Sequence, residues 1–367
     1  MSEKINLASV DKNLADKKVE AEAGVRFYSV REEPFELYGF YDPLNEPVFK
    51  RLPTELAEKV SRGVTVTHLH TSGGRVRFST DSPYIHIKAV MENVEVMATM
   101  SMCGAGGFDL YQDDSVGRSS RYVKMFQPPR VIKDGYEAKI ELKGRKLRSF
   151  TINFPSYSSV KELYVGIEDG SRLGKGASYC NRLPIVYYGS SITQGACSSR
   201  PGNIYQNMVS RALNANYMNF GFSGSCLAED NILDYLVKQE MCAFVCDYDH
   251  NAPTPEYLEK THLKVYERIR AAKPDLPFIM LSRPDFDKDY DQSILRRNVV
   301  IDTYRIARSR GDENVYYIDG EGIFRGNFED SCTVDGTHPN DLGFSKMAET
   351  LCCTFRRILA DRDIFSE

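Results

Sequence analysis

The chain has 367 residues, of which 42% are hydrophobic and 27% are charged, and its net charge is −4. These values fit a globular protein with one large or two smaller domains. They argue against nucleic-acid binding, which usually needs a basic surface. No apolar run is long enough to span a membrane, and residues 1–24 contain no apolar stretch of signal-peptide length. We therefore expect a cytoplasmic protein without membrane contact.

The nine cysteines are scattered along the chain. Cys352 and Cys353 are adjacent and Cys242 and Cys246 are four residues apart, but there is no C-x-x-C pair. No histidine stands at zinc-ligand spacing from a cysteine pair. The pattern favours reduced, mostly buried thiols over a metal or redox site, and we predict no metal.

The N-terminal part of the chain predicts β-structure. Five segments alternate apolar and polar residues with a period of two, as strands with one buried face do. They are RVRFST (75–80), YIHIKA (84–89), EAKIEL (137–142), FTINF (150–154) and ELYVGIE (162–168). In the first, Val76 and Phe78 face one side, and Arg75 and Arg77 the other. Many short strands separated by Gly-, Asp- and Pro-containing turns predict an antiparallel β-sandwich, similar to a jelly roll.

The pattern changes after the Gly- and Ser-rich segment 168–184, where we place the boundary between two domains, 1–175 and 176–367. Short apolar runs then alternate with longer helical segments. The predicted strands are PIVYYG, YMNFGF, CAFVCDY, PFIMLS and VYYIDG, and helices are predicted near residues 203–213, 227–239, 255–271, 292–309 and 341–360. This alternation predicts an α/β domain whose parallel sheet is covered by helices on both faces.

Polar residues follow the predicted strands at the points where the strands end. They are Gly189-Ser190-Ser191, Gly221-Phe222-Ser223-Gly224, Asp249-His250-Asn251 and, in a later segment, Asp335 and His338. Since the carboxyl ends of parallel strands meet at one edge of a sheet, these groups should gather there. A serine, glycine amides, an asparagine amide, a histidine and a carboxylate are the parts of an acyl-transfer site.

Four of these segments resemble, in order, the four catalytic blocks of the SGNH hydrolases, also called the GDSL-type lipase/acylhydrolase superfamily. YGSSITQG is similar to the first block, NFGFSGS to the second, VCDYDHNA to the third and DGTHPND to the last. GFDLY (107–111) is similar to the G-x-D-L-Y signature of a β-sandwich domain that precedes some SGNH esterases. The resemblance implies a flavodoxin-like three-layer hydrolase domain preceded by that sandwich.

The resemblance also implies roles for five residues. Ser191 would be the nucleophile, His338 its base and Asp335 the carboxylate that orients the histidine. The backbone N–H groups of Ser191 and Gly224 and the amide of Asn251 would form the oxyanion hole. No metal or cofactor is implied. The alternative interpretations are helix caps for Ser191 and Asn251, a backbone requirement for Gly224, and an ordinary turn for Asp335 and His338.

Two blocks depart from the family pattern. Ser190 stands where the family usually has an aspartate, and G-x-N-D is replaced by D-H-N-A, which places Asp249 and His250 beside Asn251. These changes remove no catalytic group, but they affect the shape of the acyl pocket. His250 and Asp249 are candidates for lining that pocket, and a purely local hydrogen bond is the alternative for His250. We predict that GAGGFDLY forms a tight hairpin rather than a loop at the active site.

The expected activity is hydrolysis of an ester through a serine, on a small-molecule or oligosaccharide substrate. The sandwich domain favours a carbohydrate O-acetyl ester, because related two-domain esterases remove acetyl groups from polysaccharides or oligosaccharides. The alternatives are a short-chain lipid ester or thioester hydrolase, acetyl transfer to another sugar, and a catalytically silent sugar-binding protein. The sequence does not determine the acyl position, and it leaves a homo-oligomer open.

Overall fold

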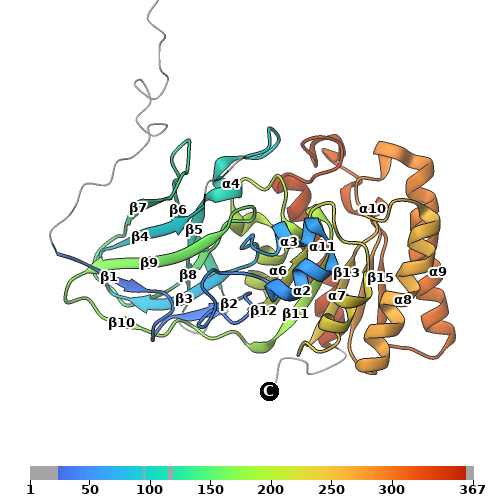
Figure 1. Cartoon of the computed structure of the whole chain (residues 1–367), viewed down its shortest axis with the longest axis horizontal. Helices are drawn as coiled ribbons and strands as arrows, with labels where there is room; N and C mark the ends of the chain where they lie inside the picture. Colours follow the sequence, from blue (N-terminus) through green and yellow to red (C-terminus); the bar gives the residue numbers. More distant parts are fainter. Residues whose placement is uncertain (1–23, 93, 95, 115–118, 361–367) are drawn as a thin grey trace, which may run out of the picture.

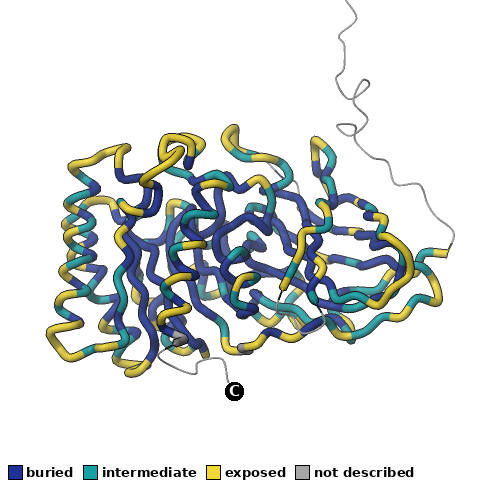
Figure 2. The backbone as a smooth tube through the Cα atoms, turned by 180° about the vertical axis from the view of Figure 1, so that it is seen from behind, coloured by how far each residue is buried: buried dark blue, intermediate teal, exposed yellow. Residues whose placement is uncertain are grey.

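The structure is a computed structural model, and it describes residues 24–360 except 93, 95 and 115–118. A β-rich N-terminal part and an α/β C-terminal part lie end to end (Figure 1). Buried backbone runs through the middle of both parts, while exposed segments lie mainly on outer helices and turns (Figure 2). Within the described ranges, no helix has the length and apolar character needed to cross a membrane.

The N-terminal part is a sandwich of two antiparallel sheets. One has the strand order β1-β9-β4-β7 and the other β10-β3-β8-β5-β6, with β2 paired to β3. The elements are β1 (Val25–Ser29), β2 (Glu36–Tyr38), β3 (Arg75–Thr80), β4 (Tyr84–Met91), α4 (Met102–Gly106), β5 (Phe108–Asp113), β6 (Ser120–Phe126), β7 (Gly135–Glu141), β8 (Arg148–Asn153), β9 (Val160–Glu168) and β10 (Leu173–Gly174). Val76 and Phe78 share one buried core with Ile85 and Ile87, so the period-two pattern correctly marks the inner faces.

The outer face of β3 is buried as well, although the sequence pattern predicts only one buried face. Arg75 and Arg77 are 1% and 2% exposed, because the α/β part packs against this sheet. The Arg75 guanidinium lies 3.9 Å from the ring centre of Tyr217 and donates hydrogen bonds to the Tyr217 carbonyl and to Oδ1 of Asn216. The polar side of this strand is therefore an interface between the two parts.

Two short helices interrupt the β-rich part where only strands were expected. They are α2 (Thr54–Val60) and α3 (Arg62–Thr67). Leu52, Ala57 and Val64, from this segment, belong to the same hydrophobic core as residues of the α/β part. The N-terminal part thus contributes a segment to the core of the C-terminal part.

The C-terminal part is a five-stranded parallel sheet between two layers of helices (Figure 1). Its strand order, β12-β11-β13-β14-β15, is the flavodoxin-like order. The strands are β11 (Asn181–Gly189), β12 (Ala215–Gly221), β13 (Ala243–Asp247), β14 (Phe278–Leu281) and β15 (Val315–Ile318). The helices are α5 (Ser191–Gln194), α6 (Tyr205–Leu213), α7 (Asp230–Leu236), α8 (Pro255–Ala272), α9 (Tyr290–Ser309), α10 (Glu321–Phe324) and α11 (Asp341–Ala360), with 3₁₀ turns η1 (Pro201–Asn203), η2 (Phe286–Asp289) and η3 (Glu329–Ser331).

Successive residues of β11 point into opposite layers. Val186 and Tyr188 lie in the core shared with α7, α8 and α9, whereas Ile185 and Tyr187 lie in the core shared with α6 and α11. Burial on both faces explains why the strands of this part read as continuous apolar runs. All nine cysteines are free thiols, and six of them are buried.

Candidate active site

Ser191 lies at the turn between β11 and α5. It is the first residue of α5 and is 8% exposed. Ser190 caps this helix, because its Oγ accepts the N–H of Ile192 at 3.2 Å. Gly195 follows the helix with φ 100°, a left-handed conformation that favours glycine. The two adjacent serines therefore differ: Ser190 shapes the turn, and Ser191 lies at the carboxyl edge of the sheet.

Ser191 contacts a histidine from a distant segment of the chain. Its Oγ is 2.9 Å from Nε2 of His338, and Nδ1 of His338 is 2.7 Å from Oδ2 of Asp335. Both partners stand in the loop before α11, with side chains 28% and 32% exposed. Residues predicted from two separate blocks thus form one chain of hydrogen bonds that a substrate can reach from solvent.

The loop itself holds Asp335 in position. Oδ1 accepts the N–H groups of Thr337 (3.0 Å) and His338 (2.8 Å), which leaves Oδ2 for the imidazole. Burial alone would raise the pKa of Asp335, but hydrogen bonds from the backbone and ring of His338 lower it to about 2. The ionised carboxylate accepts a hydrogen bond from Nδ1–H, so Nε2 is free to accept a hydrogen bond from the Ser191 hydroxyl.

Gly224 and Asn251 lie on two loops that a hydrogen bond connects. Gly224 has φ +65°, a conformation in which a side chain would be strained. Two residues further on, the N–H of Cys226 donates to Oδ1 of Asn251 at 3.2 Å. The oxygen of this amide therefore points to the neighbouring loop, and Nδ2 is the end that can face a substrate.

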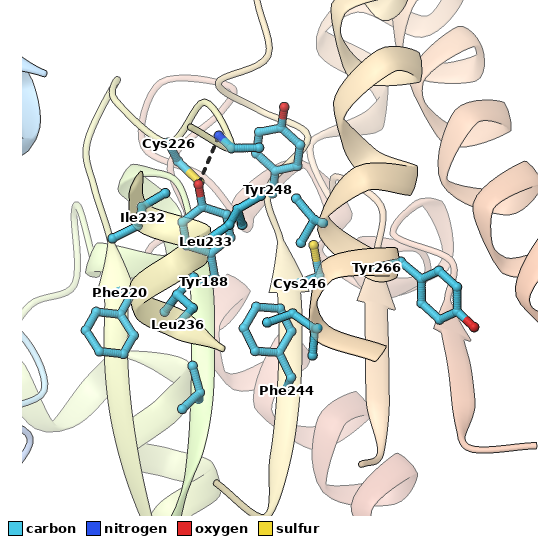
Figure 3. Close-up of a cluster of buried hydrophobic side chains, with 14 of the residues drawn as sticks. Tyr188, Phe220, Cys226, Ile232, Leu233, Leu236, Phe244, Cys246, Tyr248 and Tyr266 are labelled. Carbon is cyan, nitrogen blue, oxygen red and sulfur yellow. Dashed lines mark hydrogen bonds between the residues drawn. The ribbon is translucent and has the colours of Figure 1, made fainter. Parts of the chain in front are cut away.

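A buried aromatic cluster supports both loops where they leave the sheet. The rings of Tyr188 and Tyr248 stack with their centres 6.1 Å apart. The hydroxyl of Tyr188 accepts the N–H of Ala228 at 3.0 Å, beside Cys226 (Figure 3). Because Tyr188, Tyr248 and Cys226 are fully buried, the bases of the two loops are held by dense packing.

Asp249 and His250 belong to a buried ion network. Nδ1 of His250 is 3.2 Å from Oδ1 of Asp249, and Nε2 is 2.7 Å from Oδ1 of Asp285. Arg283 pairs with Asp285 through two hydrogen bonds of 2.9 and 2.5 Å. The side chains of Asp249 and His250 are 0% and 6% exposed. The contacts agree with a local hydrogen-bonding role for His250, and a part in the acyl pocket stays a prediction for both residues.

Among the residues that the structure describes, Asp247, Asp249 and His250 form a group that could hold a metal ion, with ligand atoms within 4.8 Å of one another. Asp247 also accepts hydrogen bonds from Thr193 (2.9 Å) and Tyr205 (3.0 Å), and burial raises its pKa to about 6. A protonated His250 and the nearby arginines balance these carboxylates, so the charges of the group do not call for a metal ion.

The N-terminal part directly contacts the turn that carries Ser191. The Tyr157 hydroxyl is 3.3 Å from the carbonyl oxygen of Ser191 and 3.4 Å from Oγ of Ser223. Ser72 donates to the carbonyl of Gln194 at 2.5 Å, and Oε1 of Gln194 accepts the N–H of Ser223 at 3.0 Å. These contacts join the first two catalytic blocks to the sandwich. The sequence offered no signal for them, because loop residues of these types are common.

The GFDLY segment, most of which lies in β5, forms hydrogen bonds to the loop that follows α5. Asp109 is fully buried and accepts hydrogen bonds from the N–H of Gly202 (2.8 Å) and from Nη1 of Arg200 (3.0 Å). The preceding glycines form α4, and a Cβ at Gly104 would lie 2.1 Å from the carbonyl oxygen of Ser198. The predicted tight hairpin is therefore wrong. The segment is a short helix and a strand packed against this loop.

A groove of about 450 Å³ lies beside Tyr157, entirely within the N-terminal part. Val66, Leu69, Val94 and Met97 are among its lining residues. Val66 and Met97 are 56% and 52% exposed, so apolar surface is open to solvent here. Tyr157, which lines the groove, also contacts the carbonyl oxygen of Ser191 through its hydroxyl.

Two family models match the chain. Residues 182–356 match the GDSL-like lipase/acylhydrolase family, and residues 25–173 match the GxDLY N-terminus of SGNH-hydrolase-type esterases. The α/β part belongs to the GDSL-like lipase/acylhydrolase family. The sandwich matches the GxDLY N-terminus of SGNH-hydrolase-type esterases, as GFDLY predicted. Among curated proteins, no sequence matches significantly.

Solved structures share the fold of this GDSL-like hydrolase. A protein from Bacteroides ovatus that resembles GDSL lipases is 26% identical with a TM-score of 0.81, over 92% of this chain and 98% of that one. A salicylyl-acyltransferase from a tetracycline biosynthetic pathway is 17% identical with a TM-score of 0.75, over the same shares. An acetyl xylan esterase from Butyrivibrio proteoclasticus is 12% identical with a TM-score of 0.57, over 92% of this chain and 99% of that one. Family membership supports acyl ester hydrolysis as the activity.

Proposed function

We propose that this GDSL-like hydrolase is a serine esterase that removes O-acetyl groups from carbohydrates. The observation that carries the proposal is the geometry at Ser191, whose Oγ is 2.9 Å from Nε2 of His338. The other ring nitrogen is 2.7 Å from Asp335. A serine hydroxyl becomes an effective nucleophile when a positioned base takes its proton. The three residues stand where the family places its catalytic blocks, which supports these roles.

In the proposed reaction, Oγ of Ser191 attacks the ester carbonyl carbon while its proton moves to Nε2 of His338. The resulting oxyanion accepts hydrogen bonds from the N–H groups of Ser191 and Gly224 and from Nδ2 of Asn251. His338 then gives the proton to the departing alcohol oxygen, which leaves an acetyl-enzyme. Water, deprotonated by the same imidazole, releases acetate and restores Ser191.

Two features support a carbohydrate acetyl ester. The acetyl xylan esterase shares the fold of both parts of the chain. The groove beside Tyr157 is lined by apolar residues together with polar ones such as Thr65 and Glu92, a mixture suited to a sugar ring with its apolar faces and polar rim. An acetyl group at Ser191 would leave the sugar to occupy this groove.

The test compares acetate release from p-nitrophenyl acetate and from acetylated oligosaccharides by the wild type, Ser191→Ala and Ser210→Ala. Ser210 is a buried serine on α6 that donates to the Ala215 carbonyl at 2.7 Å, so its loss tests the effect of deleting a buried hydroxyl elsewhere. We expect Ser191→Ala to lower kcat by at least about a thousandfold and Ser210→Ala to keep wild-type kcat. Activity that survives in Ser191→Ala would refute the proposal.

Further assays on the same purified protein distinguish the alternative functions. A preference for long acyl chains or thioesters over acetyl esters would favour a lipid or thioester hydrolase. Failure of the wild type to react with a fluorophosphonate probe would favour a silent sugar-binding protein, since only an activated serine reacts.

Acyl transfer to an alcohol is a second candidate, favoured by the TM-score of 0.75 to the salicylyl-acyltransferase. Hydrolysis and transfer share the acetyl-enzyme and differ only in the acceptor. Mass spectrometry of products formed with an excess of unacetylated oligosaccharide decides between them. Acetate without acetylated acceptor supports the esterase.

A further inference from the structure

Buried contacts hold the turn that carries Asn251 on both sides. Nη1 of Arg296, on α9, donates to the carbonyl oxygens of Asp249 (2.7 Å) and Ala252 (2.9 Å). The N–H of Arg283, which follows β14, donates to Oδ2 of Asp249 at 2.9 Å. The backbone before and after Asn251 is therefore tied to two neighbouring elements.

His250 provides a further anchor immediately before Asn251. Its ring nitrogens lie 3.2 and 2.7 Å from carboxylate oxygens of Asp249 and Asp285. Nε2 donates a hydrogen bond to the carboxylate of Asp285, while Nδ1 lies at ion-pair distance from Asp249 without hydrogen-bond geometry. A ring placed between two carboxylates is stabilised as an imidazolium. Burial alone would lower the pKa of His250, but Asp285 and Asp249 raise it to about 10. Arg283 holds Asp285 on its other side, so the ring has a single defined place.

We propose that His250 is a positioning residue for the oxyanion hole and that it acts through Asn251. The imidazolium clamps the turn between Asp249 and Asp285, while the N–H of Cys226 holds Oδ1 of Asn251. Together these contacts direct Nδ2 of Asn251 toward the substrate oxygen. The inference rests on the proposed function, in which Asn251 donates to the oxyanion. It also explains the D-H-N-A block, because its two ionisable residues form the clamp.

Replacing the imidazolium by a neutral side chain leaves two buried carboxylates without the cation between them. Arg283 still contacts both carboxylates, but buried charges that lose one of their cationic partners are less well compensated, so the turn should relax. Losing an oxyanion donor outright costs about 100- to 1000-fold in kcat, and a displaced donor should cost part of that. We therefore expect His250→Gln to lower kcat by about 10- to 100-fold, with little change in KM for p-nitrophenyl acetate.

A double-mutant cycle on the full chain tests the route of the effect. It compares kcat for p-nitrophenyl acetate in the wild type, His250→Gln, Asn251→Ala and the double variant. If His250 acts through Asn251, His250→Gln should lower kcat by less than about threefold when it is introduced into Asn251→Ala. His262→Gln is the matched control. His262 is a buried histidine on α8 whose Nδ1 is 2.9 Å from Oγ1 of Thr303, and its substitution should leave kcat within about twofold.

The inference is overturned if His250→Gln lowers kcat equally in the wild type and in Asn251→Ala. It is also overturned if His250→Gln does not lower kcat. If His250→Gln does not fold by circular dichroism, Asp285→Asn takes its place in the same cycle, since it weakens the clamp from the other side. An Asn251→Ala variant with wild-type kcat overturns it too. A failure of the proposed function would give a different result, because ester hydrolysis would then persist in Ser191→Ala.

Discussion

At the scale of single residues, the proposed reaction depends on which nitrogen of His338 carries the proton. Asp335 is ionised and accepts from Nδ1, which leaves Nε2 as the acceptor toward Ser191. An asparagine at position 335 keeps the shape, but its NH₂ group would favour a proton on Nε2 instead. We expect Asp335→Asn to lower kcat by about 10³- to 10⁴-fold with little loss of stability, measured with p-nitrophenyl acetate.

The control for this substitution is Asp330→Asn, the same change at an exposed aspartate of the same loop region. It should retain wild-type kcat. A loss below about tenfold in Asp335→Asn would show that this carboxylate does not set the tautomer of His338.

At the scale of elements, the turn after β13 should make stability depend on pH. The groups facing His250 are Asp247 on β13, Asp249 in the turn, Arg283 and Asp285 after β14, and Arg296 on α9. The pKa of His250 is raised from 6.5 to about 10. Its contribution to stability is thus fully present below pH 6.5, falls as the pH rises and is lost above about 10.

Urea unfolding of the wild type and His250→Gln at pH about 6 and about 10.5 measures this contribution. We expect the wild type to be more stable than the variant at the lower pH and the difference to shrink at the higher one. Titrating groups away from His250 act on both proteins alike and cancel, whereas the carboxylates around His250 belong to the contribution measured. A difference that stays constant would show that the ring carries no folding-linked proton.

Most elements of the C-terminal part could be predicted from the sequence because its strands are buried on both faces and the helices α8, α9 and α11 are long. The prediction for 255–271 differs from α8 by one residue at its end. The packing of the sandwich was harder to predict from the sequence. Arg75 and Arg77 look like a solvated face, because a period of two shows that the faces differ and not what covers each of them. The sequence pattern did not predict the short helices α2 and α3, since their stability comes from the distant core that they join.

The candidate site was likewise predictable in part, because some of its residues stand in sequence motifs and others depend on packing. Ser191, Asn251 and His338 were predictable because each stands in a recognisable block at the end of a strand or before a helix. The contacts of Tyr157 with Ser191 and Ser223 were not, because they depend on how the two parts dock. The network around His250 joins segments 35 residues apart, and a single sequence carries no trace of that pairing.

At the scale of the whole molecule, the two parts are not independent bodies. Arg51 is fully buried at their junction, and its guanidinium donates to the carbonyl oxygens of Thr67, His70, Asn219 and Gly221. Segments of the N-terminal part also complete the core on one side of the parallel sheet. The domain boundary expected near residue 175 therefore lies between the two matched sequence families, but one core of the C-terminal part includes residues from before that boundary.

Residues 176–367 produced alone should consequently be unstable. Leu52 and Val64 would no longer cover Phe220 and Phe222, and burying each large apolar side chain contributes about 1.5–3 kcal/mol. We expect this fragment to aggregate, and the full chain to unfold in a single thermal transition. Circular dichroism and size-exclusion chromatography provide the check, with co-expression of residues 1–175 as the rescue. A folded, monomeric fragment with the melting temperature of the full chain would contradict the expectation.

The distance along the chain between Ser191 and His338 has a consequence during synthesis on the ribosome. The serine is translated 147 residues before the histidine that would activate it. The sandwich residues that contact this turn, Ser72 and Tyr157, are translated before the serine. If Ser191 and His338 act as proposed, ester hydrolysis should begin only after the loop before α11 has emerged from the ribosome and docked.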